Sequence, residues 1–361
     1  MIIFNVYDQG KYAVAFLAAL SVFIAVGLVM SLPVDLDSDN DGILDKDNFQ
    51  HFKKFQSKFR RNCTNGTTEC KSRKRNYANH LKRLGRFKNN TKNCSYEMGE
   101  TRFMDWSDVE LKSMVVDPNL LPKPANNWKP DTSSRRKRQA VGNFDWRTSG
   151  AVNPVRDQGG CGSCWAFATV AAIEIQTNNV NKRYNANRRA FSEQYVLDCS
   201  TTNGCNGGWP YNAITWVQNN GIARNTSYGP YASAVKSCPT GRVIDKPVIG
   251  TQVLTGSPAQ MLTYIKNTGP VTVAYYVCTD FFYYTGGVYS GNCQTTSSTY
   301  QGGHAVTIVG YGTLNGVDYW LARNSWGPNW GIAGYFMIKR NVDDSKIESW
   351  SVVGPKCTTT A

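Results

Sequence analysis

Histidine is scarce in this chain. Only 3 of the 361 residues are histidine, namely His51, His80 and His304. None of them is close enough to another to form the paired ligands of a zinc module, so the sequence argues against such a module. Cysteine, by contrast, occurs 11 times, which is many for a cytosolic enzyme and ordinary for a disulfide-bearing secreted protein.

Acidic residues are also few relative to basic ones. The chain has 26 Asp and Glu against 40 Lys and Arg, a net charge of +14, and such an excess can indicate nucleic-acid binding. The excess is uneven, however, because residues 139–361 hold 16 basic and 11 acidic residues. Most of the basicity therefore lies before residue 139, in a region that we expect to be removed, and we predict no nucleic-acid partner.

Residues 1–34 contain the longest apolar stretch. Residues 12–34 are uncharged and largely apolar, which is about the length that spans a bilayer. We expect either a signal anchor, giving a single-pass membrane protein with a cytoplasmic N-terminus, or a cleaved signal peptide. Both alternatives lead into the secretory pathway.

Residues 35–48 form an acidic segment after this stretch. Their aspartates are spaced like the first half of an EF-hand calcium loop, but Asn48 stands where that loop has its bidentate glutamate. Two interpretations stay open, a solvated acidic linker and a weak calcium site. The candidate ligands are Asp37, Asp39, Asp41 and Asp45.

The strongest chemical signal is the segment QGGCGSCWAFA at residues 158–168. It places Cys164 between a small-residue turn and an apolar run that predicts the start of a helix, where the helix dipole favours a thiolate nucleophile. A C-x-x-C pair can also be a redox or zinc motif, but the chain lacks the second ligand pair and the βαβ context. His304 precedes an alternating apolar run that predicts a strand-borne imidazole, which could serve as general base.

The motifs CGSCW around Cys164, GHAVTIVGYG around His304 and NSWGPNWG from Asn324 resemble the papain family of cysteine proteases. The resemblance implies an α+β fold of two lobes, a helical left lobe with Cys164 and a β-barrel-like right lobe with His304 and Asn324, over residues 139–361. It implies a cysteine endopeptidase that forms an acyl-enzyme, with His304 as base, Asn324 as its orienting residue and Gln158 as an oxyanion-hole donor. Polypeptides would be the substrates, and no cofactor is implied.

The same resemblance implies substrate-binding residues. Gly207 and Gly208 resemble the backbone rail of the family, and Gly303 precedes the base where relatives often have Asp or Asn. Trp350 would form the floor of the P2 pocket, so we predict small or medium apolar P2 residues and poor use of P2 arginine. The other residues implied at the pocket or over the catalytic pair are Trp209, Pro210, Ala274, Ala305 and Trp326.

For the cysteines, the resemblance suggests the disulfides Cys161–Cys205 and Cys199–Cys238. The pairing of Cys293 stays open between Cys278 and Cys357.

Residues 49–116 resemble an inhibitory helical propeptide. The family pattern is Glu, Arg, Phe, Asn, Ile, Asn. Here Glu69 and Arg73 match it, Tyr77 and Leu84 are conservative replacements, and His80 and Lys88 depart from it. Residues 117–138 are expected to form a linker whose final Arg-Arg-Lys-Arg directs a furin-like protease to cut between Arg138 and Gln139. Five glycosylation sequons support a secreted or lysosomal protein: Asn62, Asn65, Asn89, Asn93 and Asn225.

An alternative of another class is a membrane-anchored glycoprotein in which an inactive protease fold acts as a binding module. An intact set of Gln158, Cys164, His304 and Asn324 favours the enzyme.

Overall fold

The computed structural model describes residues 42–90, 94–117, 119, 142–200, 203–240 and 244–359. The N-terminal apolar segment, three of the candidate calcium ligands, the sequon at Asn93 and the cleavage site after Arg138 lie outside them. Within them, no helix has the length and apolar character needed to cross a membrane. Asp45 caps a helix instead, accepting a hydrogen bond from the backbone N–H of Asn48 at 2.8 Å, and the described residues contain no cluster of side chains suited to a metal ion.

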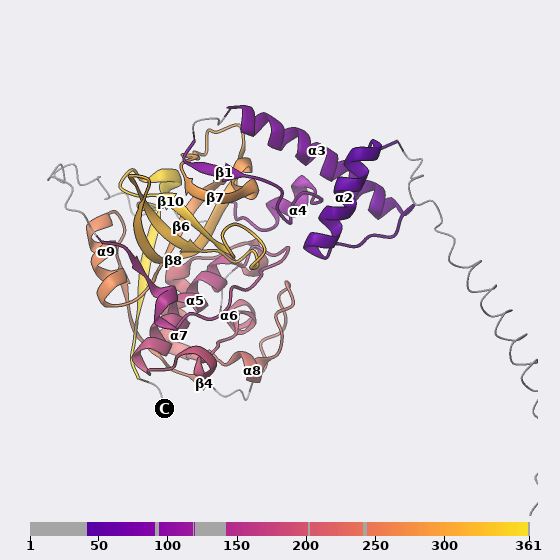
Figure 1. Cartoon of the computed structure of the whole chain (residues 1–361). Coiled ribbons are helices and arrows are strands. Elements are labelled where there is room, and N and C mark those ends of the chain that lie inside the picture. Colours follow the sequence, from indigo (N-terminus) through magenta and orange to yellow (C-terminus); the bar gives the residue numbers. More distant parts are fainter. Residues whose placement is uncertain are drawn as a thin grey trace, which may run out of the picture.

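The N-terminal elements form an arm beside the main body (Figure 1). Three phenylalanines of the first helix are buried, and two of them, Phe52 and Phe55, pack with Tyr77 of the second. Tyr77, His80 and Leu84 lie buried along one face of that second helix, as the helical spacing predicts. A disulfide between Cys63 and Cys70 closes the turn between the two helices. The elements of the arm are α2 (Lys46–Phe59), α3 (Thr68–Asn90), β1 (Tyr96–Met98) and α4 (Asp108–Lys112).

One lobe of the main body is helical. Its central helix, α5 (Cys164–Val180), is apolar on nearly all sides and buried from Cys164 to Asn178, as expected for a helix that other elements surround. The remaining elements of this lobe are η4 (Asn185–Asn187), α6 (Glu193–Cys199), η5 (Gly204–Asn206), α7 (Pro210–Asn220), β3 (Ile222–Ala223), α8 (Asn225–Tyr228) and β4 (Ile244–Asp245).

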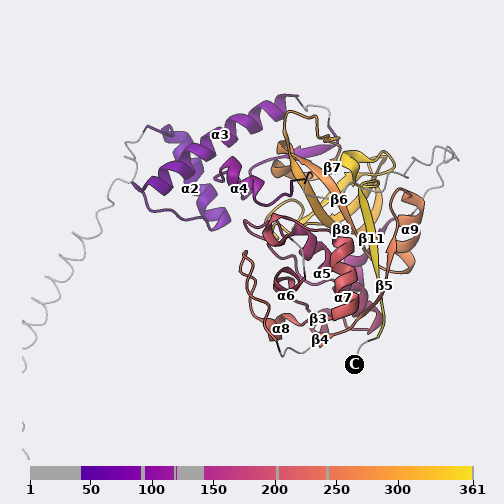
Figure 2. The same cartoon turned by 180° about the vertical axis from the view of Figure 1, so that it is seen from behind.

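The other lobe is a mostly antiparallel sheet, seen from both sides in Figures 1 and 2. Its strand order is β1-β7-β10-β9-β8-β6-β11-β5, with β2 paired to β8, so in the described part of the chain the strands form an open path and not a closed barrel. The elements are β2 (Phe144–Asp145), η3 (Trp146–Ser149), β5 (Val248–Val253), α9 (Pro258–Asn267), β6 (Val271–Cys278), η6 (Thr279–Tyr283), β7 (Tyr284–Tyr289), β8 (Tyr300–Leu314), β9 (Val317–Arg323), β10 (Tyr335–Lys339), η7 (Asp344–Lys346) and β11 (Ser351–Cys357).

The long strand β8 joins the two lobes. It pairs with β6 and β9, and the hydroxyl of Thr307 donates to the backbone oxygen of Ala168 in α5 at 3.0 Å. This contact sets the helix that begins at Cys164 against the strand that carries His304. The expected two-lobe α+β fold, preceded by a helical propeptide, is confirmed.

Three disulfides lie in the main body. Two of them join Cys161 to Cys205 and Cys199 to Cys238. The third joins Cys278 at the end of β6 to Cys293, with 5.7 Å between their Cα atoms, which decides the pairing left open above. Three described cysteines keep a free thiol: Cys94, Cys164 and Cys357.

Candidate active site

Cys164 is the first residue of α5 and is 1% exposed. The turn before it is held by the Cys161–Cys205 disulfide and by a hydrogen bond from the N–H of Gly162 to the oxygen of Cys205 at 2.9 Å. A Cβ at Gly162 would lie 2.3 Å from that oxygen, so glycine is required for the turn to pass so close. The sequence thus fixes the thiol at the N-terminus of a buried helix.

His304 and Asn324 are brought together by the register of β8 and β9. Thr307 lies opposite Arg323 in this ladder, and the next residue after β9 is Asn324. Its Oδ1 lies 2.8 Å from Nε2 of His304 and accepts the backbone N–H of Ser325, also at 2.8 Å. Because this atom accepts from Ser325 it is an oxygen, so His304 donates through Nε2–H. The lone pair of its Nδ1 is then free for a proton, and Nδ1 is buried without a hydrogen-bond partner in the described part of the chain.

Gln158 lies buried beside the same residues. Its Oε1 accepts the hydroxyl of Ser325 at 2.6 Å, and its Nε2 donates to the backbone oxygens of Cys161 and Met114 at 2.8 and 2.9 Å. Carbonyl oxygens can only accept, so these two backbone contacts identify the Nε2 end of the amide, and the Ser325 hydroxyl holds the opposite end. The sequence reading did not assign this role to Ser325, although the residue directly follows Asn324 in the NSWG motif.

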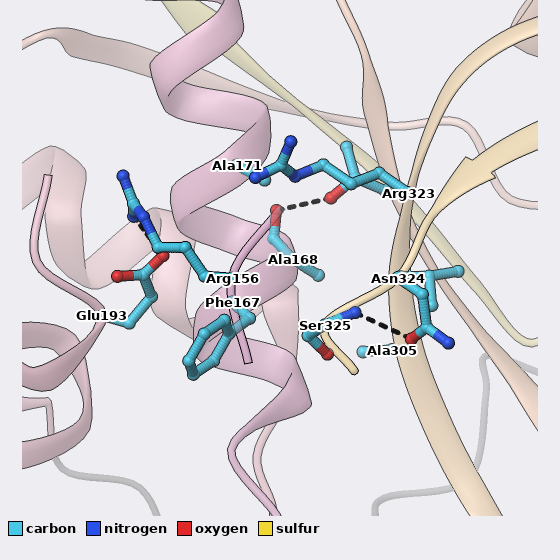
Figure 3. A pocket seen from close by; sticks show the side chains of 11 residues that line it. Arg156, Phe167, Ala168, Ala171, Glu193, Ala305, Arg323, Asn324 and Ser325 are labelled. Atoms are coloured by element: carbon cyan, nitrogen blue, oxygen red, sulfur yellow. Dashed lines mark hydrogen bonds and ion pairs between the residues drawn. The ribbon is translucent and has the colours of Figure 1, made fainter. Parts of the chain in front are cut away.

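Beside the His304–Asn324 pair, a small pocket lies between α5 and the sheet (Figure 3). Ala168 and Ala171 of the helix face Ala305 and Arg323 across it, and Asn324 and Ser325 lie at one side with their hydrogen bond. Trp326 covers the pair from another direction, since its ring lies 4.8 Å from the imidazole of His304, centroid to centroid. The Asn324–His304 hydrogen bond is thereby kept out of water.

The end of the arm lies across the cleft. Val116 and Gly303 exchange two backbone hydrogen bonds of 2.8 Å, and the oxygen of Met114 occupies the Nε2–H of Gln158. A Cβ at Gly207 would lie 2.3 Å from the side chain of Val116, so this glycine lets the segment approach. The propeptide thus binds the groups that a substrate would need.

Burial changes the electrostatics of the site. It raises the pKa of the Cys164 thiol to about 11, and it lowers the pKa of the His304 imidazole to about 4. The sequence led us to expect a thiolate stabilised by the helix dipole, and in the proenzyme burial opposes that charged form. The thiolate and the imidazolium are both disfavoured here because each would lose its solvation in a buried site.

Cys164 and Val116 are among the residues that line a second pocket. The aromatic residue at its floor is Trp350, which packs against Trp209 and Tyr276 with ring centroids 5.9 and 4.7 Å apart. A Cβ at Gly303 would lie only 2.4 Å from this indole, so glycine is required at this position beside Trp350. The sequence reading missed Tyr276. The expected residues around the pocket are Gly208, Trp209, Pro210, Ala274, Gly303, Ala305 and Trp350.

Comparison with known proteins agrees with this arrangement. Residues 140–354 match the family described as papain family cysteine protease. The chain is 34% identical over 281 residues to germination-specific cysteine protease 1 of Arabidopsis thaliana, covering 75% of this chain and 72% of that protein. It is also 34% identical over 279 residues to ananain of Ananas comosus, covering 75% of each.

Several solved structures with a similar fold are precursors. Recombinant stem bromelain precursor superposes with a TM-score of 0.71 at 30% identity, covering 86% of this chain and 99% of that one. Digestive procathepsin L2 from Tenebrio molitor larval midgut gives a TM-score of 0.69 at 32% identity over the same shares. This chain therefore belongs to the papain family of cysteine proteases, and its structure is that of a proenzyme whose own propeptide lies in the active-site cleft.

Proposed function

We propose that Cys164 is the nucleophile of an endopeptidase and that His304 is its general base, oriented by Asn324. The observation that carries this proposal is the 2.8 Å hydrogen bond from His304 Nε2 to Asn324 Oδ1, because it leaves Nδ1 free to receive the thiol proton. The sulfur attacks the substrate carbonyl, and His304 returns the proton to the departing amine as the C–N bond breaks. A water molecule activated by His304 then cleaves the C–S bond of the acyl-enzyme.

We propose that two donors, Gln158 Nε2–H and the backbone N–H of Cys164, stabilise the oxyanion of the tetrahedral intermediate by hydrogen bonds. Support comes from Met114, whose carbonyl oxygen occupies the Gln158 donor in the proenzyme as a substrate carbonyl would. Hydrolysis of an internal bond in a peptide blocked at both ends, followed by mass spectrometry of the fragments, tests the endopeptidase assignment. Release of single residues or dipeptides from free ends alone would refute it.

Propeptide removal should restore thiol reactivity. With a pKa of about 11, only about one Cys164 in 10⁴ is a thiolate at pH 7, so alkylation of the proenzyme should be slow until pH exceeds about 10. In the mature enzyme the cleft is solvated, and alkylation should already be fast between about pH 5 and 7. Rates of iodoacetamide reaction against pH, before and after processing, measure this difference, and superimposable profiles would contradict it.

For specificity, we propose that small or medium apolar P2 residues are preferred and that P2 arginine is disfavoured. The pocket that holds Val116 is closed by the indole of Trp350, and Trp350 brings volume but no charge. In an apolar pocket, one methylene more or less on the substrate side chain changes kcat/KM by about tenfold or more.

Trp350→Ala should enlarge this pocket and raise the kcat/KM ratio of P2 phenylalanine to P2 valine by about tenfold. A P2 substrate library measures the ratio. Trp216→Phe is the matched control, because Trp216 packs against Tyr195 in the helical lobe and should leave the ratio unchanged. Highest turnover for P2 arginine or phenylalanine in the unmodified enzyme would exclude the proposal.

We further propose passage through the secretory pathway to a lysosome or the extracellular space, with cleavage after Arg138 by a furin-like protease. The four disulfides support an oxidising compartment. Asn62, Asn65 and Asn89 are exposed and Asn225 is half-buried, so these sequons are open to glycan addition. Residues 12–34 would then serve either as a membrane anchor or as a signal peptide that is cleaved. Mass spectrometry of the N-terminus of the purified proenzyme distinguishes the two.

A further inference from the structure

A carboxylate of the catalytic domain holds an arginine of the arm at the rim of the cleft. Asp157, directly before Gln158, forms an ion pair with Arg102, which lies in the segment between β1 and α4. The same guanidinium nitrogen, Nη1, also donates to the backbone oxygen of Trp326 at 3.1 Å. The catalytic domain thus supplies two acceptors for one cationic side chain, and the mechanism proposed above uses neither of them.

Both acceptors are held in place by the backbone around them. Asp157 and Trp326 face one another as an isolated antiparallel bridge. The N–H of Gly327, the next residue, donates to the oxygen of Arg156 at 3.1 Å. Oδ1 of Asp157 accepts the N–H of Gly159 at 3.0 Å, so Oδ2 is the atom that binds the guanidinium. Acceptors that are already oriented lose little freedom when a cation binds to them.

The site is accessible to a side chain from outside the catalytic domain. Asp157 is 37% exposed even with the Arg102 side chain bound. A Cβ at Gly327 would lie 3.0 Å from Nη1 of Arg102 and 3.6 Å from Oδ2 of Asp157, so this glycine leaves space for the guanidinium. Within the part of the chain that the structure describes, Arg102 is the one cation that forms an ion pair with Asp157. Departure of the arm therefore leaves this carboxylate without its cation.

The position of the carboxylate relative to the reacting bond follows from its neighbours. Val116 lines the pocket assigned to P2, before the scissile bond. Trp326 does not line that pocket and covers the His304 imidazole instead, with 4.8 Å between the ring centroids. Because His304 gives its proton to the departing amine, the residues after the scissile bond pass beside His304 and Trp326. Asp157, bridged to Trp326, therefore lies next to the substrate positions P1′ to P3′.

We propose that Asp157 is a specificity-determining residue of the mature enzyme and that it selects substrates with a basic side chain at one of these three positions. The inference rests on the endopeptidase function proposed above. Arg102 occupies the carboxylate in the proenzyme, and an arginine or lysine of the substrate takes its place after processing. An exposed ion pair contributes modestly, so we expect about a fivefold preference in kcat/KM.

Peptides with an internally quenched fluorophore, which differ only in arginine or citrulline at P1′, P2′ or P3′, test this preference. Citrulline has nearly the shape of arginine without its charge. We expect kcat/KM to be about fivefold higher for arginine at one position when the ionic strength is about 0.1 M, where the Debye length is about 10 Å. The ratio should fall below about twofold at about 1 M salt, where that length is about 3 Å.

Asp157→Asn should abolish the preference, and its amide oxygen can still accept the N–H of Gly159. Asp157→Ser is the second variant if Asp157→Asn does not fold. Asp318→Asn is the matched control, because it makes the same charge change opposite Thr313, near the tip of the β8–β9 hairpin, and it should keep the preference. Equal kcat/KM for arginine and citrulline at all three positions would overturn the inference, and so would a preference that survives in a folded Asp157 variant.

Equilibrium binding to the Cys164→Ser protein separates this inference from the catalytic assignment. The protein is processed by an added protease and separated from its propeptide, and the fluorescence anisotropy of the labelled peptides is measured. Arginine should lower Kd by about fivefold relative to citrulline, and Asp157→Asn should remove the difference. A binding preference without any cleavage by the parent would refute the endopeptidase and keep the site for a basic residue. Cleavage or binding without the preference would refute that site alone.

Discussion

Replacement of Cys164 by serine should reduce kcat/KM on a peptide amide by about 10⁴- to 10⁶-fold, as loss of the nucleophile does in a serine protease. The physical reason is that a serine hydroxyl ionises far less readily than a thiol, and this site has a single neutral imidazole to activate it. The measurement is turnover of the mature forms, both processed by the same added protease.

The matched control for this loss is Cys357→Ser. Cys357 is also a free cysteine, but it lies at the end of β11, where burial raises the pKa of its thiol. We expect it to keep activity within about twofold. Comparable losses in both variants would show that folding and not nucleophilicity was affected.

Gln158→Ala should lower kcat by about 10²- to 10³-fold with little change in KM, as removal of one oxyanion-hole donor does. The carbonyl oxygen of Cys161, which can only accept, fixes the orientation of the Nε2–H end of the amide, so the donor is already oriented when charge develops on the substrate oxygen. Steady-state kinetics on the mature enzyme separate the two constants.

Gln260→Ala, an exposed glutamine in the first turn of α9, is the control and should have no effect. Alkylation of Cys164 in Gln158→Ala should proceed at the parent rate, since the thiol is untouched. A kcat within threefold of the parent would remove Gln158 from the oxyanion hole.

Sequence motifs predicted which residues form this site better than they predicted the pKa of the Cys164 thiol in the proenzyme. The turn and helix around Cys164, the strand of His304 and the position of Asn324 all follow from local patterns that the fold preserves. The raised pKa of the Cys164 thiol does not, because it reflects burial in the folded proenzyme, where Val116 of the propeptide, 48 residues away in the sequence, lines the same pocket as the thiol.

The contacts that the sequence reading missed are all tertiary. Tyr276 meets Trp350 through the pairing of β6 with β11 and β8, and Ser325 meets Gln158 across 167 residues. No local pattern encodes such pairs. The sequence shows that His80 departs from the family pattern, but its contacts with the Tyr283 hydroxyl and the Trp106 carbonyl oxygen appear only in the folded protein.

The most direct test of the central claim is titration of the processed enzyme with a thiol-directed epoxide, followed by mass spectrometry of the labelled peptide and by assay of residual turnover. The account predicts one label per molecule, on Cys164, with activity falling in proportion and with no label in Cys164→Ser. Folded, processed protein that takes up no label and has no turnover would contradict it, and the inactive binding protein would then be the better description.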